Sequence, residues 1–450
     1  MTQKRILLLT EFKFRDLPGM AYLKVVLERR YGHRVMLAPG ANNDTLDGVF
    51  RPDLVVFPFL WSPANVARAR ALRERGVAIA VILTEGHSLF EGGLAQVAGK
   101  FTDLSVTDLY FVWNEQIHER IRRYGTLPEE RVVRAGVQRF DFYRPPLTKL
   151  HASREAFCAK YGLDPRRQII TCATNFGFVR LAGSPSEIAA TQKKYEDEGL
   201  AQFALYSDIV RVVQREVETR DLVAQTCLRI AAVFPDVTLV VKPHPSEPPR
   251  WYEELFAAAG LKNVTVVHRE VIWDVLNASD VHLHRSCTTG VEAWLLDKPT
   301  IDMQVNPQEV QFSPEMAEGG SVARSIDDVV AGVSHYLCGG RTTPTQVDAR
   351  NALIHDWYDG VDGHATERHA DRLHQLLMSR STPATPRGSF RNNAAVRLRW
   401  ALGLEHYEPL RRAFHPAGER VDDGGRDKHI RGADAQSWTR RIDDALGPVR

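Results

Sequence analysis

Val240-Val241-Lys242-Pro243-His244-Pro245 is the stretch that best indicates the fold of this chain, together with Ser286-Cys287-Thr288-Thr289-Gly290, which begins 42 residues after His244. In each case a short apolar run ends in side chains that can hold phosphate, and a helical pattern follows the second run. Short buried strands that alternate with helices are typical of a parallel sheet covered on both faces. The two stretches therefore predict two places to hold phosphate beside such a sheet.

The alternation of strand and helix patterns extends over most of the 450 residues. A chain of this length exceeds what one hydrophobic core usually organises. Strands are predicted at 6–9, 34–37, 54–57, 78–83, 110–113 and 132–135, and again at 168–172, 238–241, 264–267, 281–284 and 300–303. Between the two sets, Arg144-Pro145-Pro146 interrupts regular structure. We expect an α/β protein with two Rossmann-like doubly wound domains, 1–145 and 146–378, that face a shared cleft.

Residues 379–450 predict a tail with three parts. Ser, Thr, Pro, Gly and Asn dominate 379–393, which is typical of a linker. Residues 394–414 interleave apolar side chains with arginines, as in a basic amphipathic helix. Such a helix either packs on protein or lies on an anionic membrane surface. The last 35 residues, rich in Asp, Arg and Gly, are expected to be poorly ordered.

Composition narrows the class of protein. The net charge is +2, and the five cysteines show no CxxC spacing, which fits neither a zinc ribbon nor a secreted disulfide framework. The apolar run near residue 6 is too short for the core of a signal peptide, and no apolar run reaches the length of a membrane span. We expect a cytoplasmic protein without a nucleic-acid partner, which could contact the inner face of the membrane through 394–414.

The second domain carries the candidate phosphate-binding residues. Lys242 and His244 can both donate hydrogen bonds to a phosphate as it becomes a leaving group, and Pro245 helps to fix their loop. A purely structural histidine at a strand end is the alternative. The three hydroxyl residues Ser286, Thr288 and Thr289 precede a helix, where they would either bind an anion with the helix amides or simply cap the helix.

Two further side chains of this domain are candidates for donor binding. Glu292 follows in the first turn of that helix, where a carboxylate either complements the helix dipole or bonds ribose hydroxyls. Asn175 follows the first strand of the second domain and is placed to touch a ligand.

The first domain offers two carboxylates at strand ends. In Thr84-Glu85-Gly86-His87, Glu85 could act as general acid or base on an acceptor hydroxyl, and Gly86 would let the backbone turn close to a substrate. The alternative is an ordinary loop glutamate. Further along, Asp141 could be a nucleophile or a charge stabiliser and Arg139 could hold an acidic group, or the two could form a structural ion pair. His87 belongs to the same loop as Glu85, with an acceptor-binding or structural role.

The sequence predicts neither a metal site nor a cofactor. No Asp-x-Asp motif follows a strand, and the acidic run Glu196-Asp197-Glu198 is typical of a solvated face. Lys242, His244 and a helix N-terminus could neutralise a phosphate or diphosphate without a cation. A nucleotide-activated donor would then enter as a substrate.

These motifs, in this order, resemble those of the GT-B glycosyltransferases of bacterial surface-polysaccharide assembly, in particular Kdo transferases and sialyltransferases that use CMP-activated acidic sugars. The resemblance covers about residues 5–378 and is carried by Glu85-Gly86, Arg139-Phe140-Asp141, His244-Pro245 and the Ser286-to-Thr289 stretch. It departs from the family at Thr84-Glu85, where two acidic residues are usual, and at Gly136-Val137-Gln138-Arg139, where the family has Gly-Asn-Pro-Arg.

The resemblance implies a metal-independent enzyme of capsule or lipopolysaccharide biosynthesis. Such an enzyme would transfer Kdo or a related acidic sugar from a CMP-linked donor to an oligosaccharide or lipid-linked glycan, with retention. Asp141 would be its nucleophile and Glu85 its acid/base. Three alternatives remain open: a CDP-linked polyol-phosphate transferase, a UDP-sugar transferase or 2-epimerase of the same fold, and a non-catalytic scaffold docked through 394–414.

Overall fold

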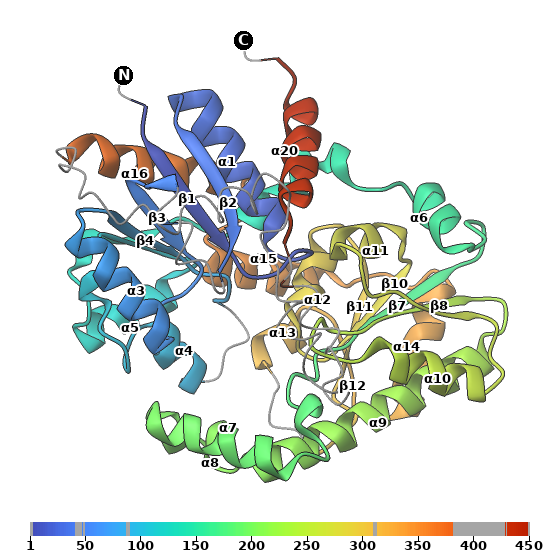
Figure 1. Cartoon of the computed structure of the whole chain (residues 1–450). Helices are drawn as coiled ribbons and strands as arrows, with labels where there is room; N and C mark the ends of the chain where they lie inside the picture. The colour runs from blue at the N-terminus through green and yellow to red at the C-terminus, as the bar shows by residue number, and fades with distance from the viewer. Residues whose placement is uncertain are drawn as a thin grey trace, which may run out of the picture.

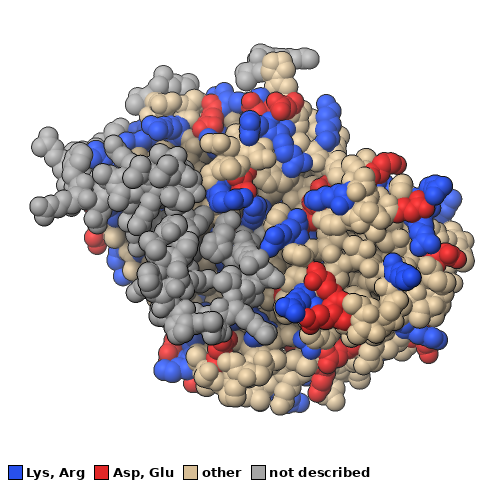
Figure 2. Space-filling model, turned by 45° about the vertical axis from the view of Figure 1, so that its right-hand side comes forward, with Lys and Arg blue, Asp and Glu red and all other residues tan. Residues whose placement is uncertain are grey.

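The computed structural model describes residues 3–40, 47, 50–86, 91–308, 313–380, 428 and 430–448. Two parallel sheets of six strands, each with helices packed around it, make up the body of the protein (Figure 1). This arrangement confirms the predicted two-domain α/β architecture of the GT-B fold. On the face shown in Figure 2, basic and acidic side chains are interspersed.

The first sheet has the strand order β2-β1-β3-β4-β5-β6. Its strands are β1 Arg5–Thr10, β2 Arg34–Pro39, β3 Leu54–Phe57, β4 Ala78–Ile82, β5 Leu109–Val112 and β6 Val132–Arg134. The helices α1 Leu17–Tyr31, α3 Pro63–Glu74, α4 Glu91–Val97 and α5 Glu115–Tyr124 follow them in the chain. Every residue of β3, β4 and β5 is buried, because helices cover both faces of a parallel sheet. Continuous apolar runs were for this reason a sound signal for these strands.

The second sheet has the strand order β12-β11-β10-β7-β8-β9. Its strands are β7 Ile169–Ala173, β8 Thr238–Lys242, β9 Val264–Val266, β10 Val281–His284, β11 Thr300–Met303 and β12 Ser321–Ala323. The helices around it are α6 Arg154–Tyr161, α9 Ile209–Val233, α10 Pro249–Ala258, α11 Ile272–Ala278, α12 Thr288–Trp294, α13 Pro314–Glu318, α14 Ile326–Leu337 and α15 Pro344–Tyr358. The edge strand β12 was not predicted; it has three residues, two of them only partly buried.

A helical arm leaves the second domain after β7 and returns to it at α9 (Figure 1). It contains α7 Pro185–Asp197 and α8 Ala204–Ser207. The arm packs closely against the first domain at Gly92 of α4. A Cβ added to Gly92 would lie only 2.7 Å from the ring of Tyr206, which belongs to the arm. Phe203 of the arm also meets Phe101 edge to face, with ring centroids 6.1 Å apart. The two domains therefore touch on the arm side.

The chain ends on the first domain. Helix α16 Ala365–Ser379 packs on α1, and so does a last helix, α20 Gly432–Leu446 (Figure 1). Trp438 and Ile442 of α20 are buried. The expectation that the last 35 residues are poorly ordered is therefore wrong for 430–448. Composition was misleading there, because two apolar side chains one helical turn apart are enough to dock a polar helix.

The predicted basic helix at 394–414 lies outside the described residues, so its binding to a membrane surface stays a prediction. Among the helices that the structure does describe, none is both long and apolar enough to span a bilayer.

Candidate functional site

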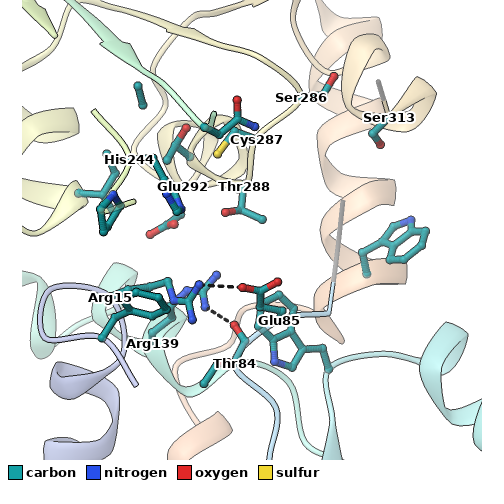
Figure 3. A pocket seen from close by; sticks show the side chains of 18 of the residues that line it. Arg15, Thr84, Glu85, Arg139, His244, Ser286, Cys287, Thr288, Glu292 and Ser313 are labelled. Carbon is teal, nitrogen blue, oxygen red and sulfur yellow. Dashed lines mark hydrogen bonds and ion pairs between the residues drawn. The ribbon is translucent and has the colours of Figure 1, made fainter. Parts of the chain in front are cut away.

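A cavity of about 750 Å³ lies at the carboxyl ends of strands from both sheets and is lined by both domains. Its size suits a small-molecule ligand. Figure 3 shows Arg15, Glu85 and Arg139 on one side, with His244, Thr288 and Glu292 opposite them. The predicted residues that line it are Glu85, Arg139, Asn175, Lys242, His244, Pro245, Ser286, Thr288, Thr289 and Glu292.

His244 lies in the loop that follows β8. Its Nδ1 accepts the backbone N–H of Ser246 at 3.2 Å and lies 2.6 Å from the Ser246 hydroxyl. Burial, together with the positive charges of Arg15, Lys242 and Arg285, lowers the pKa of His244 to about 3. The ring is therefore neutral at neutral pH and carries its proton on Nε2. That N–H is the donor that His244 can offer to a phosphate.

The buried carboxylate of Glu247 holds this loop against the neighbouring one. Its Oε1 accepts the Thr174 hydroxyl at 2.6 Å and the backbone N–H groups of Phe176 and His244 at 3.0 and 3.2 Å. Its Oε2 accepts the Tyr252 hydroxyl at 2.5 Å. Burial raises the pKa of Glu247, and these hydrogen bonds oppose that rise. Glu247 thus joins the ends of β7 and β8 on the second-domain side of the cavity, and sequence analysis missed it.

Asn175 lies on the loop after β7 and lines the cavity. Its Oδ1 accepts a hydrogen bond from Arg285 Nε at 2.8 Å, and its Nδ2 donates to the Arg285 carbonyl at 3.1 Å. These bonds fix the Asn175 amide to the loop after β10.

The loop between β10 and α12 uses part of its hydroxyls for its own structure. Ser286 has a φ of +40°, and its backbone N–H and its hydroxyl both donate to Asp302, at 2.7 and 2.9 Å. The Thr289 hydroxyl lies 3.1 Å from His282 Nε2. The three predicted hydroxyls therefore do not converge on one anion as equal donors, because the hydrogen of Ser286 is committed to Asp302.

Glu292 connects the two domains. It is only 5% exposed, and its Oε2 accepts the hydroxyl of Tyr143 at 2.6 Å. Tyr143 belongs to the 3₁₀ helix η3 Gln138–Tyr143 of the first domain, whereas Glu292 belongs to α12. Burial raises the pKa of Glu292, while Arg139 and the bond from Tyr143 lower it. Glu292 was expected either to complement the helix dipole or to bind ribose. Its hydrogen bond from Tyr143 shows that it also links the two domains.

On the opposite wall, Glu85 is held by Arg15. Arg15 Nη1 lies 3.0 Å from Glu85 Oε1, and the Glu85 side chain is 45% exposed (Figure 3). Arg139 Nη1 donates to the Thr84 carbonyl at 3.0 Å, and its guanidinium lies 4.8 Å from the Trp113 ring centroid. Sequence analysis missed Arg15, although it follows β1 and the rule about strand ends that selected Glu85 applies to it as well.

Gly86 makes room for an indole ring, because a Cβ at this position would lie 2.5 Å from the Trp113 ring. That the glycine also lets the backbone turn close to a substrate stays a prediction. Trp113 in turn donates its Nε1–H to the Leu83 carbonyl at 2.8 Å. His87 lies outside the described residues.

Asp141 does not line the cavity, which contradicts its predicted place as the nucleophile. It is 2% exposed, and its two oxygens accept the backbone N–H groups of Ala365 and Thr366 at 3.1 and 2.7 Å. These amides begin α16, so Asp141 satisfies the start of that helix. Burial raises the pKa of Asp141 to about 6 even though the hydrogen bonds oppose the rise.

One group of side chains in the described part of the chain has a geometry that could hold a metal ion, namely Glu115, His118 and Glu119 of α5. None of the three lines the cavity. Glu115 already pairs with Arg134 at 2.6 Å, and Glu119 pairs with Arg122 at 2.5 Å. The group is therefore explained by surface ion pairs.

No protein-family model and no curated protein matches the sequence. Solved structures, in contrast, match most of the chain. The UDP-GlcNAc 2-epimerase from Neisseria meningitidis bound to UDP-GlcNAc gives a TM-score of 0.52 at 12% identity, covering 82% of this chain and 100% of that one. The S. aureus MnaA–UDP structure gives 0.51 at 15% identity, covering 84% and 97%.

The wall teichoic acid polymerase TagF, as a histidine variant soaked with CDPG, gives a TM-score of 0.50 at 10% identity and covers 83% of this chain and 88% of that one. Identities this low show the fold alone. The likeness to all three structures confirms the two-domain GT-B fold.

Proposed function

We propose that this protein is a glycosyltransferase that moves a sugar from a nucleotide-linked donor, bound in the cavity, to a hydroxyl group of a glycan acceptor. The observation that carries the proposal is the arrangement of one cavity. Lys242 and His244 line it from the second domain, whereas Arg15, Arg139 and the carboxylate of Glu85 line it from the first. Phosphate-binding groups thus face an acid–base group across the cleft.

Lys242 and His244 would stabilise the leaving phosphate. Lys242 is 8% exposed and is the last residue of the buried strand β8. A charge-assisted hydrogen bond in such a water-poor setting is stronger than the same bond in bulk water. The neutral His244 ring adds an N–H donor without adding charge. Negative charge that develops on the phosphate as the sugar departs is therefore met by donors that are already in place.

Glu85 would take the proton from the acceptor hydroxyl. Arg15, 3.0 Å away, orients the carboxylate toward the cleft, and the partial exposure of Glu85 leaves room for an acceptor. Retention was predicted with Asp141 as a covalent nucleophile, but both oxygens of Asp141 are occupied by α16. We therefore propose a single displacement, in which the acceptor oxygen attacks as the bond to phosphate breaks, with inversion at the anomeric carbon.

A CMP-linked acidic sugar, Kdo or a relative, is the donor that we propose. It carries two anionic groups, one phosphate and one sugar carboxylate, and the cavity has cationic side chains on both walls: Lys242 on one, Arg15 and Arg139 on the other. A CDP-linked polyol phosphate also carries two negative charges, on the adjacent phosphates of its diphosphate, and the shared fold with a TagF structure soaked with CDPG favours it as the second candidate.

A binding screen tests the donor. Each of CMP, CDP, UDP, GDP and dTDP is added to the full chain and thermal unfolding is followed, because a ligand that binds only the folded state stabilises it by about 2.7 kcal/mol at 100 times its Kd. Selective stabilisation by CMP is expected, and it should disappear in Lys242→Ala. Preference for CDP would support the polyol-phosphate alternative, and preference for UDP would reject both.

A further inference from the structure

The C-terminal helix α20 docks along α1 at the edge of the first domain (Figure 1). Arg29 of α1 holds its far end, with Nε donating to Asp443 at 2.5 Å and Nη1 donating to the Gly447 carbonyl at 2.7 Å. Trp438 and Ile442 bury the inner face of the helix. The segment is therefore packed against the body, although some 50 residues of chain separate it from α16.

The opposite end of the same segment contacts the loop that carries Arg15, residues 11–16 between β1 and α1. Lys13 Nζ lies 2.8 Å from Asp434 Oδ1, and the two side chains are 23% and 13% exposed. Lys428, just before the helix, lies 3.0 Å from Glu11 Oε1 and 4.7 Å from the centroid of the Phe12 ring. Phe12 and Arg15 both line the cavity. The C-terminal segment thus makes two ion pairs with a loop that forms part of the cavity wall.

Trp438 connects the helix to the other wall. Its ring meets that of Trp273 edge to face, with centroids 6.0 Å apart and planes at 81°. Trp273 lies in the first turn of α11 in the second domain, is 2% exposed and lines the cavity. Trp438 also packs edge to face on Phe142 of η3, at 6.2 Å. Helix α20 therefore contacts both domains close to the cavity, at Phe142 in the first and at Trp273 in the second.

We propose that α20 is a positioning element of the ligand site: it fixes the 11–16 loop, through which Arg15 orients Glu85, and it supports Trp273 across the cleft. No side chain of α20 lines the cavity, so the helix would act through these neighbours. The identity of the ligand rests on the proposed function, whereas the positioning is a property of the fold.

A charge-reversal cycle on the pair Lys13–Asp434 tests the proposal in the full chain. The variants are Lys13→Asp, Asp434→Lys and the two combined. Backbone hydrogen exchange of residues 11–16 is measured by mass spectrometry, and the Kd for CMP, CDP and UDP by calorimetry. Each single variant should raise exchange in the loop and weaken nucleotide binding about fivefold, and the double variant should recover most of both losses. Recovery stays incomplete because Asp434 also accepts the Arg431 N–H at the start of α20, which a lysine cannot do. If a single variant acted only by disturbing the packing of α20, a second charge reversal would not repair the defect.

Arg29→Ala is the matched control, since Arg29 holds α20 at the end away from the loop. It should lower the unfolding temperature while exchange in 11–16 stays within twofold of the parent. Equal loosening of the loop in this control, or no recovery in the double variant, would overturn the proposal. If a reversal variant does not fold, the milder pair Lys13→Met and Asp434→Asn is measured instead. Absence of any nucleotide binding would reject the proposed function, while the exchange data would still decide the role of α20.

Discussion

Replacing Glu247 tests whether one buried carboxylate holds the His244 loop in place. In Glu247→Ala the Thr174 hydroxyl, the Phe176 amide and the Tyr252 hydroxyl all lose their acceptor, whereas the His244 amide retains a bond to Thr174 Oγ1 at 3.2 Å. A buried donor without an acceptor costs about 1–3 kcal/mol. Because hydroxyls can turn to other partners and a backbone amide cannot, we expect a loss of roughly 3–6 kcal/mol in the free energy of unfolding.

Glu247→Gln should be much milder. The amide oxygen can take the place of Oε1 and accept the same three donors, and the amide nitrogen then faces the Tyr252 hydroxyl, which can rotate to accept. Only the charge assistance of the hydrogen bonds is lost, at a cost of about 1–2 kcal/mol. The contrast between the two variants therefore separates the need for an acceptor from the need for a charge.

Urea unfolding at pH 7 measures both variants, with hydrogen exchange of residues 174–176 and 243–247 as the local readout. Glu254→Ala is the control, because Glu254 lies on helix α10, which also carries Tyr252, and forms a surface pair with Arg250 at 2.6 Å with both side chains more than half exposed. Such pairs contribute about 0–1 kcal/mol. A loss in Glu247→Ala no larger than in this control would refute the role assigned to the carboxylate.

The site and its surroundings lead to three further predictions. Glu85→Gln should reduce sugar transfer by at least about 100-fold while leaving the nucleotide Kd nearly unchanged, and normal turnover would exclude Glu85 as the base. Burial raises the pKa of Asp141 from 3.8 to about 6, so its contribution to folding is present below pH 4 and is lost as the pH rises through 6. We expect the parent to lose about 3 kcal/mol over that window relative to Asp141→Asn, and parallel urea titrations from pH 4 to 7 would contradict this. Gly86→Ala should cost about 1–3 kcal/mol and alter tryptophan fluorescence, because the new Cβ would lie 2.5 Å from the Trp113 ring; unchanged emission and stability would show that the ring moves freely.

The structure also changes how the tail should be tested. Deletion of residues 380–450 separates an enzyme from a scaffold only if the tail, expected to hold a linker, a basic helix and a poorly ordered end, does not support the body of the protein. The deletion would now take away α20 and with it the ion pair from Lys13 to Asp434. Loss of nucleotide binding in that truncation would therefore not indicate a scaffold, and point variants of the cavity are the better test.

The amino-acid sequence by itself determined the two sheets and many of the residues that line the cavity from the second domain. The strand Leu54–Phe57 was predicted to the residue, because a strand buried on both faces is largely apolar. The bounds of Val281–His284 were also predicted to the residue, although two of its four residues, His282 and His284, are buried polar residues. The carboxyl ends of parallel strands meet at one edge, so Glu85, His244 and Ser286 could be placed at a common site without coordinates.

Only the tertiary structure decided which polar residues at those strand ends face the cavity. Asp141 follows the last strand of the first domain, yet its carboxylate is taken by the amides that begin α16, more than 220 positions later in the chain. In the same way α20 contacts the loop of Arg15 from some 420 positions away. The local pattern of apolar residues predicts which side chains are buried. The hydrogen-bond partner of a buried polar group depends on long-range packing, so it cannot be predicted from a short stretch of sequence.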